Sequence, residues 1–235
     1  MEKNSDTMGI SWPFVMTSFL LAGSLRGLET NFTSGCHWDH VYSLRCTSAG
    51  ITNLQELQKS PSWPRAPRFL KTMKHINLSN NRISSFHLNI FYKFSSLETL
   101  NISNNYISMI SINYEQEGKD VTLVSLKSLV IDRNRLTFVP KGLGKLTSLQ
   151  TLQLSANSIL RIQRDDFANC TQLQNLDLRD NRIHKIDPDA FRDLRNLQIL
   201  RLSNNALVSI TPLVFLYSHV LRADIDLSYN RWAYK

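Results

Sequence analysis

The chain has 235 residues, of which 42% are apolar and 20% are charged, and its formal net charge is +8 at pH 7. With only eight glycines and seven prolines, it is not collagen, a low-complexity linker or a disordered chain, and we expect one folded domain. The basic balance favours an acidic partner of some kind. Because Lys and Arg are dispersed among acids without a run of five, a nucleic-acid partner is not expected.

The first segment with a recognisable pattern is the uncharged stretch from Gly9 to Ala22, which is 14 residues long. This length suits the apolar core of a signal peptide and falls short of the roughly 20 residues that span a membrane. We predict a signal peptide over residues 1–27, with an uncleaved anchor or neither as the alternatives. A signal peptide implies a secreted or cell-surface protein.

Cys36 and Cys46 stand ten residues apart, directly ahead of the repeated region. A secreted repeat protein needs a closed end there, and a bridge between these thiols would stabilise the fold by about 2–3 kcal/mol. The alternatives are two buried free thiols or, with His37 and His40, a zinc site, although the spacing matches no common zinc finger. Cys170 occupies a position that large apolar residues fill in the other repeats, so we predict a buried thiol.

Four Asn-x-Ser/Thr sequons are candidates for N-glycosylation if the chain enters the secretory pathway. They are Asn31, Asn77, Asn101 and Asn169. Asn31 and Asn169 lie outside the predicted strands, and we expect these two to carry glycans.

An eleven-residue pattern, LxxLxLxxNxL, is written six times, and successive copies are 24, 29, 23, 24, 24 and 25 residues apart when a decayed seventh is included. The copies begin at Met73, Leu97, Leu126, Leu149, Leu173, Leu197 and Arg222. An earlier variant runs from Val41 to Leu54 with Cys46 at its sixth position. Such a period predicts one supersecondary unit per repeat, stacked into a solenoid.

Each residue type in the pattern has a structural explanation. Positions 4 and 6 lie on one face of a short strand and stack on their equivalents in the neighbouring coils. Position 9 turns the chain inward, and a carboxamide there can pair backbone groups that would otherwise be buried unsatisfied. These residues, which we predict to be structural, are Asn81, Asn105, Asn134, Asn157, Asn181, Asn205 and Asn230. The back wall is predicted to consist of Phe91, Leu143, Ile162, Phe167, Ile186, Phe191, Ile210 and Phe215.

This pattern resembles the leucine-rich repeat superfamily over about residues 36–232. The 24-residue form with a Phe spine and a Cys-containing cap is similar to the extracellular branch of that family. The resemblance implies an α/β solenoid, a leucine-rich repeat horseshoe with a parallel concave sheet and six to seven repeats. It implies an N-terminal cap with a first strand over 28–72, repeats over 73–232 and a truncated tail over 233–235. A membrane tether is implied only by the resemblance, since no stretch after residue 30 is long and apolar enough to span a bilayer.

No catalytic motif or phosphate loop occurs in the sequence, and we expect no enzyme activity, cofactor or metal. The acids of the returning segments are interleaved with basic residues and predict a solvated convex face. They are Asp165, Asp166, Asp187, Asp189 and Asp193.

The outward positions of repeats three to seven carry alternating charges and apolar side chains. Such a surface is suited to binding another protein. The candidate partner-binding residues are Asp132, Arg133, Gln153, Asp177, Arg179, Asp180, Gln198, Ile199, Arg201 and Tyr229. We therefore predict a recognition module for an unidentified protein. The alternatives are a matrix component that binds anionic glycans such as sulfated polymers, or an intracellular scaffold if the signal is not used.

The C-terminal edge is predicted to be the weak point of the solenoid. A linear stack leaves the apolar face of its last coil open unless a cap covers it. Here that edge carries Ile225, Leu227 and Trp232. We expect self-association there, or fraying from Leu221 onward.

Overall fold

The computed structural model describes residues 36–39, 42–59, 67–112, 115–116, 119–120, 123–215 and 222–233. They belong to the second of two compact units, which span residues 1–30 and 31–235. The predicted signal peptide and the sequon at Asn31 lie outside the described residues. Within the described ranges, no helix is both long and apolar enough to cross a membrane.

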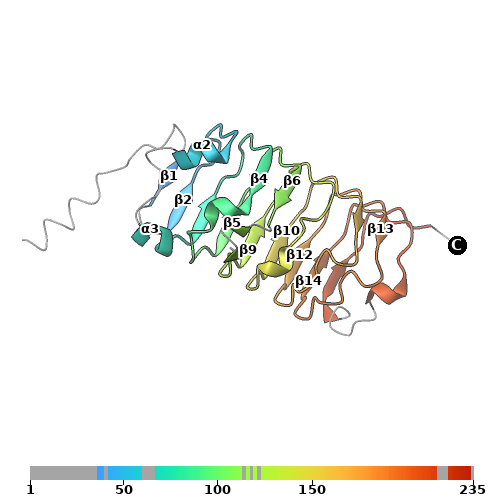
Figure 1. The fold of residues 1–235 in the computed structure, drawn as a ribbon. Coiled ribbons are helices and arrows are strands. Elements are labelled where there is room, and N and C mark those ends of the chain that lie inside the picture. Colours follow the sequence, from blue (N-terminus) through green and yellow to red (C-terminus); the bar gives the residue numbers. More distant parts are fainter. Residues whose placement is uncertain are drawn as a thin grey trace, which may run out of the picture. The chain divides into compact units, whose positions relative to one another are not determined.

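One nine-stranded sheet runs the length of this unit (Figure 1). Its order is β1 (His37–Trp38), β2 (Ser43–Arg45), β3 (His75–Asn77), β5 (Thr99–Asn101), β9 (Ser128–Val130), β10 (Thr151–Gln153), β12 (Asn175–Asp177), β14 (Ile199–Arg201) and β15 (Asp224–Asp226). Only the β1–β2 pair is antiparallel, and every other neighbouring pair is parallel. The predicted parallel solenoid is therefore confirmed.

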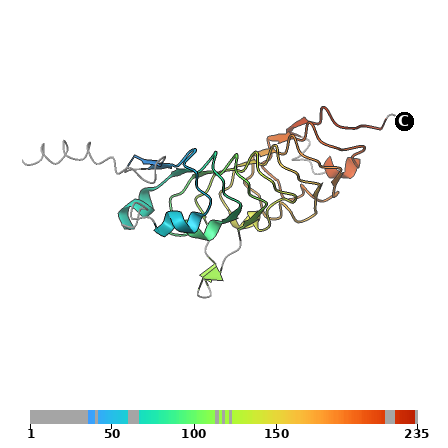
Figure 2. The same ribbon diagram turned by 90° about the horizontal axis from the view of Figure 1, so that it is seen from above.

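The remaining elements lie in the cap and the returning segments. They are α2 (Leu54–Lys59), α3 (Pro67–Thr72), β4 (Ser85–His87), η2 (Leu88–Phe91), β6 (Met109–Ser111), β7 (Glu115–Gln116), β8 (Lys119–Asp120), η3 (Leu143–Lys145), β11 (Arg161–Ile162), β13 (Lys185–Ile186) and η4 (Pro212–Phe215). β4 pairs with β6 and β11 pairs with β13, both in parallel. β7 and β8 form an antiparallel hairpin that stands away from the stacked repeats (Figure 2). This hairpin accounts for the one 29-residue spacing.

The core consists of the positions that the repeat pattern predicts. Each strand of the repeats before the last has a fully buried middle residue, such as Leu152 or Leu176. Parallel register places these two side by side. Behind them the rings of Phe167 and Phe191 stack with centroids 6.0 Å apart, and both are buried. The predicted Phe spine is confirmed.

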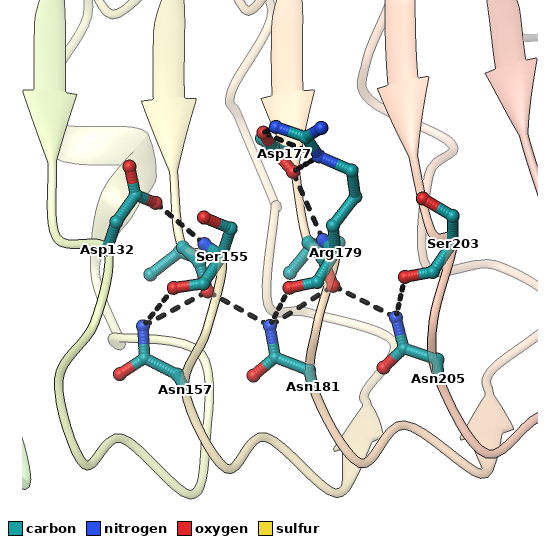
Figure 3. Close-up of polar contacts among 10 residues, drawn as sticks. Asp132, Ser155, Asn157, Asp177, Arg179, Asn181, Ser203 and Asn205 are labelled. Carbon is teal, nitrogen blue, oxygen red and sulfur yellow. Dashed lines mark hydrogen bonds and ion pairs between the residues drawn. The ribbon is translucent and has the colours of Figure 1, made fainter. Parts of the chain in front are cut away.

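A ladder of buried carboxamides joins the repeats at position 9 (Figure 3). The Asn181 Nδ2 group donates to the carbonyl oxygens of Leu154, Leu178 and Arg179 at 3.0, 3.1 and 3.1 Å. Its Oδ1 accepts from the Ile159 N–H at 3.0 Å. The other six members make the same set of contacts, reaching one repeat back along the chain. The structural role predicted for these asparagines is confirmed.

The cysteines also fall where the sequence predicts. Cys36 and Cys46 form a disulfide, and both are buried. Trp38, which lies between them in sequence, packs edge-on against Phe69 in α3 with ring centroids 4.6 Å apart. Cys170 is buried and free. Burial, aided by the charge of Asp193, raises its pKa to about 12, so the thiol stays protonated and inert.

One expectation about the convex side is wrong. Asp166 is buried, not solvated as its acidic neighbourhood suggests. Its carboxylate accepts from the Lys141 Nζ at 2.6 Å and from the Gln163 N–H at 2.7 Å. A lysine of the preceding repeat therefore reaches over to compensate the buried charge, which the spacing of charges along one repeat does not reveal.

The last repeat is less well buried than the others. Ile225, Leu227 and Trp232 pack against the core but are only partly buried, whereas Leu200 and Leu202 one repeat earlier are fully buried. This is the arrangement from which we predict a weak C-terminal edge, and self-association there stays a prediction.

Candidate functional site

The solvent side of the nine-stranded sheet, here called the concave face, is the surface that the repeats present most regularly. In β12 the middle residue Leu176 is buried, and the flanking residues Asn175 and Asp177 are half-exposed. Successive side chains of a strand point to opposite faces, so these flanking residues form two rows across the sheet. In these rows Thr151 lies opposite Asn175, and Gln153 lies opposite Asp177.

A shallow depression of about 200 Å³ opens on this face across β10, β12 and β14. It is lined by Thr151, Leu152, Gln153, Asn175, Leu176, Asp177, Ile199 and Arg201. Arg201 is half-buried, and its guanidinium forms no hydrogen bond or ion pair with the residues that the structure describes. The Gln153 carboxamide likewise has no hydrogen-bond partner among them. The depression therefore presents the polar groups of Arg201 and Gln153 beside the apolar side chain of Ile199, and the carboxylate of Asp226, the register partner of Arg201 on β15, attracts the guanidinium.

The carboxylate of Asp177 at the same depression is already satisfied. The Arg179 guanidinium donates two hydrogen bonds to it, from Nε to Oδ1 at 3.0 Å and from Nη2 to Oδ2 at 2.7 Å (Figure 3). The Arg179 N–H also donates to Oδ1 at 3.1 Å. The hydrogen bonds from the guanidinium to Asp177 raise the pKa of Arg179 above its ordinary value, and Coulomb attraction to Asp177 adds to the effect. The pair is a rigid fork, not two independent binding groups.

Asp132 is half-buried. Its Oδ1 accepts from the Ser155 N–H on the next repeat at 2.7 Å. Desolvation raises the pKa of the carboxyl, and hydrogen bonding from Ser155 opposes this shift. The carboxylate is thus committed to holding two repeats together.

Position 8 of every repeat has a left-handed backbone, a feature that the sequence interpretation missed. The residues are Asn80, Asn104, Arg133, Ala156, Asp180, Asn204 and Tyr229, with φ between 51° and 58°. Asn and Asp tolerate this conformation better than other side chains. The recurrence of Asn or Asp at position 8 in four of the seven repeats was therefore the sequence signal for a positive φ. Asp180 also accepts from the Asn204 Nδ2 group at 2.6 Å, so its role in the turn accounts for it.

The backbone of the turn gives no reason for a tyrosine at position 229. It adopts a φ of 53°, which costs a bulky residue roughly 1–2 kcal/mol. Its side chain is 84% exposed, so packing does not repay that cost. An aromatic held in this way at the rim of the last strand is available to a partner.

The structure thus divides the predicted binding residues into three sets. Gln153, Ile199 and Arg201 meet at the depression. Arg133 and Gln198 are exposed, and with Tyr229 they lie outside the depression's lining. The residues engaged within the protein are Asp132, Asp177, Arg179 and Asp180. In the described part of the chain, no group of three or more His, Cys, Asp or Glu side chains could hold a metal ion.

The first strands present a different surface. Glu98 bridges Lys74 and Lys127 at 3.1 and 3.0 Å, and hydrogen bonding first to Lys127 and then to Lys74 lowers its pKa. The sequon residues Asn77 and Asn101 are half-exposed, and each carboxamide oxygen accepts from the backbone N–H two residues on at 2.9 Å.

The third described sequon lies elsewhere. Asn169 is exposed in a returning segment, with a φ of 63°. Its backbone N–H donates to the Asp193 carboxylate at 2.8 Å, and its carboxamide has no hydrogen-bond partner among the residues that the structure describes.

Comparison with known proteins agrees with this architecture. A family model described as "Leucine rich repeat" matches residues 64–111, 124–183 and 171–231. Leucine-rich repeat-containing protein 66 of Homo sapiens is 36% identical over 183 residues, covering 64% of this chain and 20% of that protein. The Mus musculus protein of the same name is 48% identical over 48 residues, covering 20% of this chain and 6% of that protein. The chain therefore spans about a fifth or less of the length of these relatives.

Among solved structures, the crystal structure of a TLR13–ssRNA13 complex superposes with a TM-score of 0.52 at 21% sequence identity. The superposition covers 70% of this chain and 26% of that one. A likeness at this identity concerns the fold alone, and it agrees with the predicted horseshoe.

Proposed function

The chain belongs to the leucine-rich repeat family, and from that premise we propose that it is a recognition module outside the cell that binds a protein partner through its concave face. Members of this family are typically binding modules and not enzymes. A rigid β-sheet suits that task, because the binding groups on it lose little conformational freedom when a partner docks.

The depression across β10, β12 and β14 is the observation that carries this proposal. The Arg201 guanidinium is half-buried and forms no ion pair within 4.0 Å in the described chain, although the Asp226 carboxylate on β15 attracts it. A carboxylate brought by a partner would pair with this guanidinium directly. Ile199 beside it supplies apolar contact, and Gln153 supplies a hydrogen bond. Desolvated Arg beside an apolar contact is a common arrangement in protein interfaces.

Three features support an extracellular setting. The Cys36–Cys46 disulfide is of a kind that persists in oxidising compartments. The sequon at Asn169 is exposed, and the uncharged stretch from Gly9 to Ala22 matches a signal peptide in length.

Binding of the secreted full chain to intact cells tests the proposal. The variant Ile199→Ala/Arg201→Ala removes the apolar and cationic groups of the depression. The control Arg195→Ala/Leu213→Ala makes the same changes at exposed positions outside it. We expect the first variant to weaken binding by about tenfold or more, as at an interface hot spot, and the control to bind as the parent does.

Protein and polymer ligands respond differently to protease and salt. Binding through the depression should disappear when the cells are first treated with trypsin, and it should persist at about 0.5 M NaCl because a packed interface is little screened. Unchanged binding by the depression variant would refute the proposed site. Loss of binding on enzymatic removal of cell-surface glycans, to the same extent for the parent and for the depression variant, would refute the protein partner.

A further inference from the structure

The net charge of the protein is concentrated on a surface that the proposed function does not use. Immediately after the buried asparagine of each repeat, positions 10 to 14 lead from the nine-stranded sheet towards the row of short strands that includes β4, β6 and β13 (Figure 1). In the described chain these positions are residues 82–86, 106–110, 135–139, 158–162, 182–186, 206–210 and 231–233. We call this surface the basic flank.

The basic flank contains six cations and no Asp or Glu. The cations are Arg82, Arg135, Arg161, Arg182, Lys185 and Arg231, and all are exposed. They account for six of the eight net positive charges of the chain. An even scatter of charge for solubility would not leave one surface free of carboxylates.

The cations of the basic flank have no acidic ion-pair partners among the described residues. Some cations outside it, such as Lys74 and Lys141, lie within 4.0 Å of a carboxylate, whereas others, such as Arg201, have no described carboxylate within that distance. None of the six flank cations forms an ion pair with any residue in the described ranges. Arg135 instead lies over the ring of Tyr106, at 4.4 Å from the centroid. The donors of the flank are therefore available to an external anion.

Backbone geometry holds four of these arginines in one row. The Arg135 N–H donates to the Ile107 carbonyl one repeat back at 2.8 Å, and the Arg182 N–H donates to that of Ile159 at 3.0 Å. Arg82 and Arg231 make the equivalent bonds. All four occupy position 10, and one repeat separates each from the next. With about 4.8 Å between neighbouring strands, successive arginines of the row stand about 10 Å apart.

We propose that the basic flank binds an extended sulfated polysaccharide along the row formed by Arg82, Arg135, Arg182 and Arg231. The guanidinium group matches the geometry of sulfate and carboxylate oxygens in a fork. The row extends over about 30 Å, six strand spacings, so one chain can contact all four arginines at once. Arg161 and Lys185, which are register partners in β11 and β13, add a second pair of cations beside the row.

The spacing and the scarcity of stacking surfaces favour a polysaccharide over a nucleic acid. An interval of about 10 Å is on the scale of a disaccharide, whereas phosphates along a DNA strand are about 3.4 Å apart. Single-stranded nucleic acids also bind through aromatic rings on which the bases stack. Among the described flank positions, the strongly exposed aromatic residues are Tyr106, over whose ring Arg135 lies, and Phe138, too few to stack a run of bases.

Heparin oligosaccharides of increasing length and the full-length chain provide a direct test. The flank variant replaces Arg82, Arg135, Arg182 and Arg231 by Gln. The matched control replaces Lys71, Lys93, Arg195 and Arg222 by Gln, which are exposed and outside the basic flank. Both variants lose four charges, so nonspecific attraction falls equally. Thermal melts check that both remain folded.

We expect the flank variant to lose more than tenfold in affinity at physiological salt, and the control to lose less than threefold. The slope of log affinity against log salt should fall in magnitude by about three to four in the flank variant, because each of the four lost contacts contributes about 0.7–0.9. Affinity should rise with oligosaccharide length until the polymer spans the row. The Ile199→Ala/Arg201→Ala variant should bind heparin normally, which separates this site from the concave face.

Equal losses in the flank and control variants would overturn the proposal, because binding would then follow net charge alone. Tighter binding of single-stranded RNA than of heparin at matched salt, with the same sensitivity to the flank variant, would overturn the assignment to a polysaccharide. Absence of binding by the parent chain at low salt would overturn both.

Discussion

The carboxamide ladder makes a quantitative prediction at Asn181. In the variant Asn181→Ala, the buried Ile159 N–H loses its acceptor, and three carbonyl oxygens each lose one donor. None of these three is left unpaired, because Leu154 keeps a bond from Asn157, Leu178 keeps one from Asn205 and Arg179 keeps one from Ala156.

The cost can be built from these separate changes. One orphaned buried N–H costs about 1–3 kcal/mol, and each of three lost bonds with a partly satisfied acceptor costs about 0.5–1 kcal/mol. We therefore expect Asn181→Ala to lower the free energy of unfolding by about 3–5 kcal/mol. Asn175→Ala is the matched control, because Asn175 is half-exposed and makes one long contact of 3.4 Å to Thr151. That control should cost less than about 1 kcal/mol.

Urea denaturation followed by circular dichroism measures both changes. Hydrogen exchange adds a local readout, since the Ile159 amide should lose protection more than its neighbours do in Asn181→Ala. Equal stability of the two variants would refute the reasoning. Unchanged exchange at Ile159 would show that water or a shifted side chain replaces the lost acceptor.

Further outcomes follow from other parts of the structure. Because its pKa is about 12, Cys170 should resist alkylation of the native protein at pH 8 and react only after denaturation; labelling of the folded protein would contradict its burial. The raised pKa of Asp132 means that the folded state holds this proton more tightly, so its contribution is greatest below the ordinary carboxyl pKa and is lost as pH rises through the folded value. Asp132→Asn should therefore reduce the fall in unfolding free energy between the ordinary carboxyl pKa and the raised pKa of the folded state, as measured by urea denaturation over a series of pH values. An unaltered pH profile would contradict this expectation. In a eukaryotic secretory host, Asn31 and Asn169 should carry glycans and residues 1–27 should be removed, which intact-mass analysis before and after glycosidase digestion detects; a retained Met1 with no mass shift would oppose the extracellular assignment. Hydrogen exchange should be fastest over 222–233, and addition of a capping repeat should slow it and suppress self-association seen by light scattering; equal protection in both forms would show that the edge is already covered.

Much of the fold was predictable because the repeat imposes the same environment on the same position many times. Leu176, Phe191 and Asn181 each belong to a series of residues with equivalent packing, and a series is readable without coordinates. The burial of Asp166 was not predictable in this way. It depends on Lys141 of another repeat, and no other repeat contains the same pair.

The candidate site was predicted less well than the fold for a related reason. Sequence periodicity identifies which side chains face outward but not which of them pair with each other. Asp177 and Arg179 both face the solvent side, and their mutual fork removes them as free binding groups. Arg201 occupies in β14 the position that Asp177 occupies in β12. It forms no such fork with any of the described residues. Its availability emerges only from the arrangement of its neighbours.

Positions that the fold leaves free are the most informative about function. Position 9 admits Asn in every repeat, and position 8 favours residues that tolerate a positive φ, so both are explained by the backbone. Position 10 is different, since the contact to the previous repeat that all its members share is made by the backbone N–H, and any residue except proline could supply it. Ser158 and Ala206 satisfy the same bond as Arg135 and Arg182 do. Stability therefore does not require arginine there, and the row of guanidinium groups calls for an explanation outside the fold, which an anionic polymer provides.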